Sequence, residues 1–400
     1  MMNELVIEIL SNSKYMKEEK KMDADIGIIG VGTMGSMAAW QLAKKGLSVI
    51  GFEQFGIGND RTAAGGESRL FRTAYMEGPE YVPMLQEAKK LWRELETESG
   101  NSLLTLNGGL MIGESNSLEI KTVLKSIEDF KLEHEILEGD QAAIRYPQFK
   151  IYDDDLVILD KEAGFIRPEL SVVSASLLAM KHGAKLMKYT AVDEIIPETD
   201  GVRIIAEGKT YKVGKVLITT GAWTGKLLPA LKKQLIPKRL LLTWFTPKNL
   251  AETKANKLPI FARMRGDFRL TGAPSLDGSM VKASYTKDPL PIEDPSSLYR
   301  DVYPEEIEKL RESVKALLPM LYPDPVRASA YMDAYTPDNH ALLGELPGKN
   351  NTIIASGFSG HGFKLAPIIG RISSELLIEG KTKSNINHLD PGRLLSKHYK

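Results

Sequence analysis

The hydrophobic pattern near the start of the chain predicts a strand, a helix and a second strand. An apolar run begins at Ile26 and ends in a glycine-rich turn. Residues 36–44 are typical of a helix, and a second apolar run, Leu47 to Phe52, leads directly to Glu53. A strand, a glycine turn, a helix, another strand and an acid in this order are typical of a βαβ unit.

The middle of the chain continues this mixed pattern. An amphipathic helix is predicted over roughly 81–96, where Leu85, Leu91 and Trp92 share one face. The other elements expected here are strands over 108–113, 155–159, 184–187 and 215–219, a helix over 169–182 and a polar hairpin over 201–213. Because helix and strand alternate again after residue 169, this stretch resembles a second βαβ unit.

From residue 238 to 335 apolar and polar positions alternate between turn residues, which predicts antiparallel strands. We expect them over 240–246, 267–271, 279–285 and 328–334. A buried strand over 352–356 and a helix over 367–378 then return to the earlier pattern. The predicted fold class is mixed α/β and α+β, with a dinucleotide-binding βαβ domain and an interleaved antiparallel-sheet substrate domain.

This change of pattern predicts two domains that are discontinuous in sequence, as expected for a chain of 400 residues. The βαβ domain is expected to comprise residues 23–103, 165–235 and 335–400, and the sheet domain 104–164 and 236–334. Residues 1–22 are expected to be an N-terminal extension. Their short apolar stretch is broken by Glu8, unlike the apolar region of a secretory signal.

Charge and composition exclude several classes of function. Lys and Arg together number 52, and so do Asp and Glu, so the chain has no excess charge for nucleic acid or a membrane surface. No apolar run is long enough to cross a bilayer, and the six histidines show no metal-ligand spacing. We expect a cytoplasmic protein, a monomer or small homo-oligomer, that binds a small molecule and no metal.

The first glycine-rich motif, Gly30-Val-Gly32-Thr33-Met34-Gly35, stands where the βαβ unit turns from strand to helix. Its glycines let the backbone approach a pyrophosphate, and the helix N-terminus favours the negative charge. Glu53 is expected to accept a hydrogen bond from a ribose hydroxyl. The motif suits NAD and FAD equally, so it predicts a dinucleotide without choosing between them.

The second glycine-rich motif, Gly357-Phe-Ser-Gly360-His361-Gly362-Phe363-Lys364, leads from a buried strand toward a helix. Glycine lets backbone N–H groups lie close to a flat ligand, and a helix N-terminus stabilises the negative charge of a reduced flavin. A lysine there opposes the helix dipole by about 0.3–1 kcal/mol, so Lys364 is expected to have an anionic partner. The alternative is a solvated lysine after a structural turn. His361 is as compatible with a hydrogen-bonding role in the turn as with catalysis.

Three further cations are candidate site residues. Arg69 and Arg72 lie on one side of the chain if their segment is helical, and together they suit a carboxylate. The alternative is a surface pair with Glu67, Glu77 or Glu80. Lys282 shares a strand face with Ser284. If that sheet covers a flavin, Lys282 supplies a fixed positive charge to a developing superoxide; if it faces water, it only improves solubility.

Together these motifs resemble those of the FAD-dependent monomeric sarcosine oxidase and N-methyltryptophan oxidase family, within the wider group of D-amino-acid-oxidase-like flavoproteins. The resemblance spans nearly the whole chain from Asp23, and its most specific part is 357–364. It implies that Arg72 and Lys364 hold a substrate carboxylate. It also implies that Arg69 lies against the flavin and that Lys282 promotes the reaction with oxygen. The other residues it places at the cofactor are Arg61, Ser68, Gly221, Trp223, Gly357, Gly360, His361, Gly362 and Phe363.

The chain departs from this family at three positions. Sarcosine oxidases attach FAD through a cysteine where this chain has Tyr331, and the chain has no cysteine, so FAD is expected to be non-covalent. Thr271 and Thr286 stand where sarcosine oxidases have a tyrosine and a histidine near the substrate amine. The smaller side chains imply a substrate larger than sarcosine, such as an N-methylated aromatic amino acid or a glycated amino acid.

The function expected from the sequence is oxidation of the CH–NH group of an N-substituted amino acid, with oxygen as acceptor. The products are an imine, then an aldehyde and an amino acid, and hydrogen peroxide. Alternatives with the same cofactor are a fructosamine oxidase and a dehydrogenase that uses another electron acceptor. A nicotinamide-dependent reductase, and a flavin-binding or tRNA-modifying protein without amine oxidation, are the alternatives from other classes.

Overall fold

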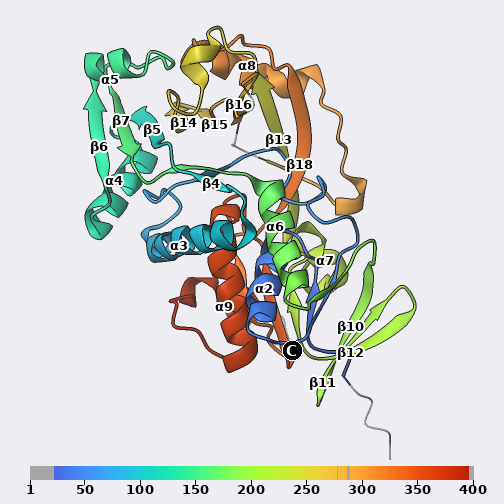
Figure 1. The fold of residues 1–400 in the computed structure, drawn as a ribbon. Coiled ribbons are helices and arrows are strands. Elements are labelled where there is room, and N and C mark those ends of the chain that lie inside the picture. Colours follow the sequence, from blue (N-terminus) through green and yellow to red (C-terminus); the bar gives the residue numbers. More distant parts are fainter. Residues whose placement is uncertain (1–21, 277, 286–288, 396–400) are drawn as a thin grey trace, which may run out of the picture.

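A computed structural model describes residues 22–276, 278–285 and 289–395, and these form two large sheets and one small one (Figure 1). Most of the predicted N-terminal extension, residues 1–21, lies outside the described residues. Each large sheet collects strands from distant parts of the chain. This arrangement confirms the predicted mixed fold class, whereas the exact domain boundaries stay a prediction. Among the described residues, no helix combines the length and apolar character needed to cross a membrane.

The first large sheet has eight strands and contains the predicted βαβ unit. Its main path runs β10-β11-β12-β1-β2-β9, with β20 paired to β12 and β19 paired to β20. Strand β1 pairs in parallel with β2 and β12, and β12 pairs in parallel with β20. The strands are β1 (Ala24–Ile29), β2 (Val49–Phe52), β9 (Lys185–Met187), β10 (Val192–Glu198), β11 (Gly201–Ala206), β12 (Lys209–Ile218), β19 (Leu342–Glu345) and β20 (Thr352–Ser356).

Helix α2 (Thr33–Lys44) lies between α6 (Pro168–Lys181) and α9 (Ala366–Glu379), as Figure 1 shows. Every residue from Met34 to Ala43 is buried. The close approach of α9 depends on Gly370, because a Cβ there would lie 2.6 Å from the backbone carbonyl carbon of Met37. The two helices are therefore in direct backbone contact.

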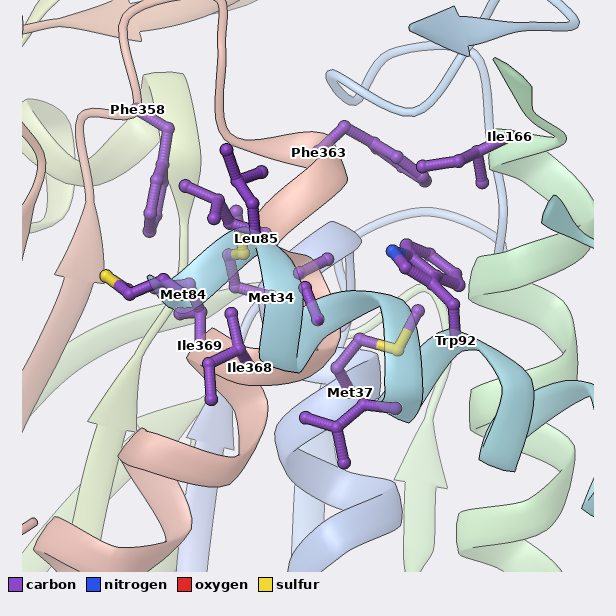
Figure 2. Packing of buried hydrophobic residues seen from close by; sticks show 14 of the residues in the cluster. Met34, Met37, Met84, Leu85, Trp92, Ile166, Phe358, Phe363, Ile368 and Ile369 are labelled. Atoms are coloured by element: carbon purple, nitrogen blue, oxygen red, sulfur yellow. The ribbon is translucent and has the colours of Figure 1, made fainter. Parts of the chain in front are cut away.

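Helix α3 (Val82–Ser99) packs across α9 and completes this core. Figure 2 shows apolar side chains from the three helices filling the space between them: Met34, Met37, Met84, Leu85, Trp92, Ile368 and Ile369. The indole of Trp92 stacks on Phe363 with ring centroids 6.0 Å apart, and its Nε1 donates to the carbonyl oxygen of Lys364 at 3.0 Å. Helix α3 thus fixes the turn that leads into α9.

The second large sheet has nine strands in the order β17-β13-β16-β15-β14-β5-β7-β6, with β18 paired to β13. All neighbours are antiparallel except β14 and β5. The strands are β5 (Gly109–Glu114), β6 (His134–Glu138), β7 (Asp155–Asp160), β13 (Ile236–Phe245), β14 (Ile260–Arg265), β15 (Phe268–Ala273), β16 (Val281–Tyr285), β17 (Leu290–Pro291) and β18 (Arg327–Tyr335).

Shorter elements complete the fold. The small sheet is formed by β3 (Arg69–Phe71), β8 (Gly164–Ile166) and β4 (Leu104–Thr105). The remaining α-helices of the described residues are α4 (Leu118–Phe130), α5 (Gly139–Arg145), α7 (Thr224–Leu227), α8 (Pro304–Leu317) and α10 (Gly392–Leu395). The 3-10 turns are η1 (Pro79–Tyr81), η2 (Gly221–Trp223), η3 (Pro229–Leu231), η4 (Leu250–Thr253), η5 (Pro295–Ser297), η6 (Phe363–Leu365) and η7 (Asn387–Leu389). The sequence did not predict α4, α5 or α8.

The predicted separation between a hairpin over 201–213 and a strand over 215–219 is wrong. Strand β12 runs without a break from Lys209 to Ile218. Its polar first half pairs with β11, and its apolar second half pairs with β1 and β20. The change from a partly exposed to a buried environment within one strand explains why its sequence looked like two elements.

A fully buried ion pair holds the second sheet together. The Arg263 guanidinium on β14 and the Asp155 carboxylate at the start of β7 are both 0% exposed, with Nη2 and Oδ2 2.6 Å apart. Arg263 also donates to the backbone oxygens of Lys150 and Met264. A buried charge that loses its partner is strongly destabilising.

We predict that Asp155→Asn lowers the free energy of unfolding by about 3 kcal/mol or more, because Arg263 is left buried without its counter-charge. Guanidinium and thermal unfolding measure the change. Asp154→Asn is the matched control, since Asp154 pairs with Arg265 but its side chain is 58% exposed. Equal stability of the two variants would contradict this account of the sheet.

Candidate functional site

The first cavity lies at the carboxyl ends of the parallel strands β1, β2, β12 and β20 and has a volume of about 520 Å³. This edge of a parallel sheet is the usual place for a dinucleotide. Its lining includes many of the residues predicted to contact the cofactor: Gly30, Gly32, Thr33, Met34, Glu53, Arg61, Arg69, Gly221, Trp223, Gly357, Gly360, Gly362 and Phe363.

The first glycine-rich turn is shaped for close backbone contact with a ligand. Gly30 has φ +88°, and a Cβ there would lie 2.7 Å from the carbonyl oxygen of Thr219. At Gly35 a Cβ would lie 2.0 Å from the carbonyl oxygen of Gly30. Among the described residues no side chain caps the N-terminus of α2, so its first N–H groups are available to an anion.

Glu53 closes the far side of this turn. Its carboxylate is buried, with Oε2 accepting from the N–H of Val31 at 3.0 Å and Oε1 from the N–H of Phe55 at 2.9 Å. Burial raises the pKa of Glu53, and the two backbone hydrogen bonds oppose this rise. Each carboxylate oxygen accepts more than one hydrogen bond, so Glu53 can also bind a ribose hydroxyl.

Aromatic side chains form another wall of the first cavity. The Arg61 guanidinium lies 4.8 Å from the Phe55 ring centroid, and Trp223 packs edge-on against the same ring at 5.7 Å. Arg61 thus lines the cavity from a fixed position, held by the face of Phe55.

A second cavity of about 630 Å³ adjoins the first. The two share six lining residues: Ala63, Arg69, Met332, Asp333, Gly360 and Phe363. One elongated ligand can therefore extend from the first cavity to the border of the second. The second cavity contains the other predicted site residues, Ser68, Arg72, Thr271, Lys282, His361 and Lys364, and Tyr331 also lines it. Thr286 lies outside the described residues.

Arg69 stands at the border of the two cavities. It begins strand β3, which pairs with β8, so the helical condition under which Arg69 and Arg72 would lie on one side of the chain is not met. The guanidinium donates to the carbonyl oxygens of Ala63, Gly65 and Ser68 at 2.5–2.8 Å. These bonds hold the loop before β3 around the cavity border. Burial lowers the pKa of Arg69 below its ordinary value.

Arg72 is buried beside the second cavity and pairs with Glu77, with Nη2 and Oε1 3.0 Å apart. Glu77 is one of the three acids considered as surface partners, but this pair is not at the surface, because Arg72 is buried. Burial acts to raise the pKa of Glu77, but the charges of Arg72 and Lys364 outweigh it and hold that pKa below its usual value. One acid thus compensates two buried cations.

Lys364 is 5% exposed, so the predicted alternative of a solvated lysine is wrong. Its Nζ donates to the carbonyl oxygen of His361 at 2.9 Å and to the hydroxyl of Tyr75 at 3.2 Å. Burial lowers the pKa of Lys364 to about 7, although Glu77 acts in the opposite direction. Near neutral pH this ammonium is therefore sensitive to any anion that enters the cavity.

Lys282 lies on β16 and points into the second cavity, on the same strand face as Ser284. Its Nζ donates to the carbonyl oxygens of Gly66 and Ser68 at 2.9 and 2.8 Å. Burial, followed by the charge of Arg69, lowers the pKa of Lys282 well below its ordinary value. The alternative of a water-facing strand lysine is wrong.

His361 and Tyr331 take structural positions at the second cavity. The His361 ring is bonded at both nitrogens, to the Tyr75 hydroxyl and to the carbonyl oxygen of Asn339, each at 2.9 Å. Tyr331 packs on the loop before β3, where a Cβ at Gly65 would lie 2.3 Å from its ring. Tyr75 and Asp333 were not predicted from the sequence, and Glu77 was predicted only as a surface partner.

Comparisons with known proteins indicate the family of the chain. Residues 25–376 match the family model described as FAD dependent oxidoreductase. The chain is 32% identical to a monomeric sarcosine oxidase of Streptomyces avermitilis, covering 92% of this chain and 97% of that one. It is 28% identical to an N-methyl-L-tryptophan oxidase of Salmonella dublin, covering 91% and 96%.

Solved structures share the fold. NikD, described as an unusual amino acid oxidase essential for nikkomycin biosynthesis, has a TM-score of 0.82 at 23% identity, covering 93% of this chain and 98% of that one. The L-proline dehydrogenase from P. horikoshii has a TM-score of 0.80 at 22% identity, covering 94% and 99%.

We predict that Gly30→Ala loses most of its bound dinucleotide, because a left-handed conformation costs about 1–2 kcal/mol for other residues and the methyl group strikes Thr219. Gly46→Ala is the matched control: Gly46 follows the same helix with φ +84° but has nothing within 4 Å of an added Cβ. Cofactor content is measured by visible absorbance after gel filtration. Equal retention in the two variants would show that close packing at Gly30 is unimportant.

Proposed function

The chain belongs to the family of FAD-dependent oxidoreductases, and from this premise we propose that it oxidises the secondary amine of an N-substituted amino acid. The observation that supports this proposal best is the buried pair of cations, Arg72 and Lys364, in the lining of the second cavity. Two cations in a partly desolvated pocket are suited to one carboxylate.

The predicted enzyme class, an FAD-dependent oxidoreductase, and the predicted cofactor are confirmed by the family. The first cavity suits FAD, because the turn at Gly30 and the uncapped start of α2 accept a pyrophosphate and Glu53 accepts from a ribose. With no cysteine in the chain, a thioether to the flavin is impossible. When bound, FAD supplies the two-electron oxidation.

In the proposed reaction Arg72 and Lys364 bind the substrate carboxylate. Glu77 already occupies the Arg72 guanidinium, so the incoming carboxylate takes over a position that this chain fills with its own acid. When the substrate carboxylate replaces Glu77, a negative charge still lies beside the two cations. This limits the free-energy cost of burying the cations. Fixing the carboxylate also fixes the C–H bond next to nitrogen, and positioning of this kind supplies much of the catalysis.

The proposed reaction transfers two electrons and two protons from the amine to oxygen. The amine loses two electrons and two protons and becomes an imine, water hydrolyses the imine to an aldehyde and an amino acid, and oxygen is reduced to hydrogen peroxide. Lys282 is the proposed oxygen-activating residue, since its ammonium is held by two carbonyl oxygens at the second cavity. A fixed positive charge there stabilises a developing superoxide.

The size and lining of the second cavity support a substrate larger than sarcosine. Its volume is about 630 Å³, and Leu240, Leu242, Met264 and Leu270 give it an apolar wall. Thr271 leaves space at one of the positions where sarcosine oxidases carry a larger side chain. We therefore propose N-methylated amino acids with bulky side chains as substrates, and glycated amino acids as the second candidates because polar residues Asn339 and His340 also line the cavity.

The experiment that tests the proposed function is anaerobic addition of a panel of N-methyl and N-glycated amino acids to the FAD-bound protein, followed by its visible spectrum. Loss of the oxidised-flavin absorbance with one class is expected and identifies the substrate class. An oxygen electrode, with and without an artificial dye, then separates an oxidase from a dehydrogenase. A fully reconstituted protein that no amine bleaches would contradict the proposal.

We predict that Lys282→Met slows reoxidation of the flavin by oxygen on the order of a hundredfold, because it removes a preorganised charge from the developing superoxide. Anaerobic reduction by substrate should change little. Stopped-flow absorbance measures both half-reactions, and Lys282→Arg, which keeps the charge, should retain much of the oxygen reaction. Unchanged reoxidation in Lys282→Met would refute this role.

A further inference from the structure

A buried tyrosine, Tyr75, connects the side chains of His361 and Lys364 in the second glycine-rich motif. Tyr75 is 0% exposed. Its hydroxyl oxygen lies 3.2 Å from Nζ of Lys364 and 2.9 Å from Nδ1 of His361. Nothing in the proposed reaction so far uses this residue.

The hydrogen bonds around His361 fix the direction of this connection. Its Nε2 lies 2.9 Å from the carbonyl oxygen of Asn339, and a carbonyl only accepts, so Nε2 carries the proton. Burial lowers the pKa of His361, so the ring is neutral near pH 7 and Nδ1 is an acceptor. The Tyr75 hydroxyl must therefore donate to His361, which leaves its lone pairs to accept from Lys364.

A Tyr75 hydroxyl that accepts from Lys364 favours the charged form of the lysine. Hydrogen bonding to the charged form of a group stabilises that form, so Tyr75 opposes the effect of burial on the lysine. The Tyr75 ring acts in the same sense, because Nζ of Lys364 lies 4.9 Å from its centroid and Cζ of Arg72 lies 6.0 Å from it.

The other titratable groups facing this cluster come from three neighbouring segments: Arg72 and Glu77 from the loop after β3, Glu80 and Tyr81 from η1, and His340 from the loop after β18. Glu77 raises the pKa of Lys364, and Arg72 lowers it.

We propose that Tyr75, oriented by His361, is a positioning residue that aims the ammonium of Lys364 at the substrate carboxylate and keeps it charged. This inference rests on the proposed function, in which Lys364 binds that carboxylate. Tyr75 acts only through Lys364 and does not itself touch the substrate.

The test measures how the affinity for a carboxylate depends on pH. The FAD-bound protein is titrated with phenylacetate, which has no amine to oxidise, and with the neutral phenylacetamide as a comparison, using the visible flavin spectrum. The ammonium is charged below its pKa and loses its charge as the pH rises through it. Phenylacetate should therefore bind more weakly above a midpoint at about pH 7 in the wild type, whereas phenylacetamide should show no such midpoint.

In Tyr75→Phe the midpoint of the pH dependence of phenylacetate binding should fall by about one pH unit. At any pH above the wild-type midpoint, phenylacetate should then bind about tenfold more weakly than to the wild type. Tyr81→Phe is the matched control. Tyr81 is equally buried, and its hydroxyl contacts Nδ1 of His340 at 2.7 Å, but it makes no hydrogen bond to Lys364. Its midpoint should stay at the wild-type value.

A second variant keeps the proposal open to refutation if Tyr75→Phe fails to fold. His361→Leu removes the acceptor that turns the Tyr75 proton away from Lys364, so its midpoint should also fall. An unchanged midpoint in either folded variant overturns the role of Tyr75. A wild type that binds phenylacetate no better than phenylacetamide instead contradicts the proposed function, and the role of Tyr75 with it.

Discussion

The backbone contact between helices α2 and α9 is the constraint on which the rest of the structure depends. Gly370 permits it, since a side chain there would strike Met37. Helix α2 begins at the glycine-rich turn of the first cavity, and α9 begins directly after η6, whose Phe363 and Lys364 line the second. One close contact between two helices therefore constrains the distance between the glycine-rich turn of the first cavity and the residues that line the second.

The parts of the fold that the sequence predicted well are those whose signal is local. The turn at Gly30 lies between a buried strand and a helix that are adjacent in sequence, so spacing alone identifies the βαβ unit. Lys282 was placed on the correct strand face because side chains alternate along a strand. Which surface that face meets is a question of tertiary structure, and only the resemblance to known oxidases suggested an answer.

The parts that sequence could not give depend on contacts between distant segments. Arg69 belongs to a three-residue strand that exists because β8, nearly a hundred residues later, pairs with it. A helical reading of so short a segment was equally compatible with its sequence. Tyr75 was missed for the same reason, because its partners His361 and Lys364 lie more than 280 residues away.

Glu77 shows how a ligand site can be recognised without its ligand. Two cations buried together repel each other, so a folded chain must supply an acid to compensate them. Glu77 does this for Arg72 and Lys364, and it does so from a partly exposed position at the cavity wall. If the three charges served stability alone, an apolar cluster of similar volume would do as well. Charges retained at the wall of the second cavity, where an anion can replace the acid, support the proposed recognition of a carboxylate.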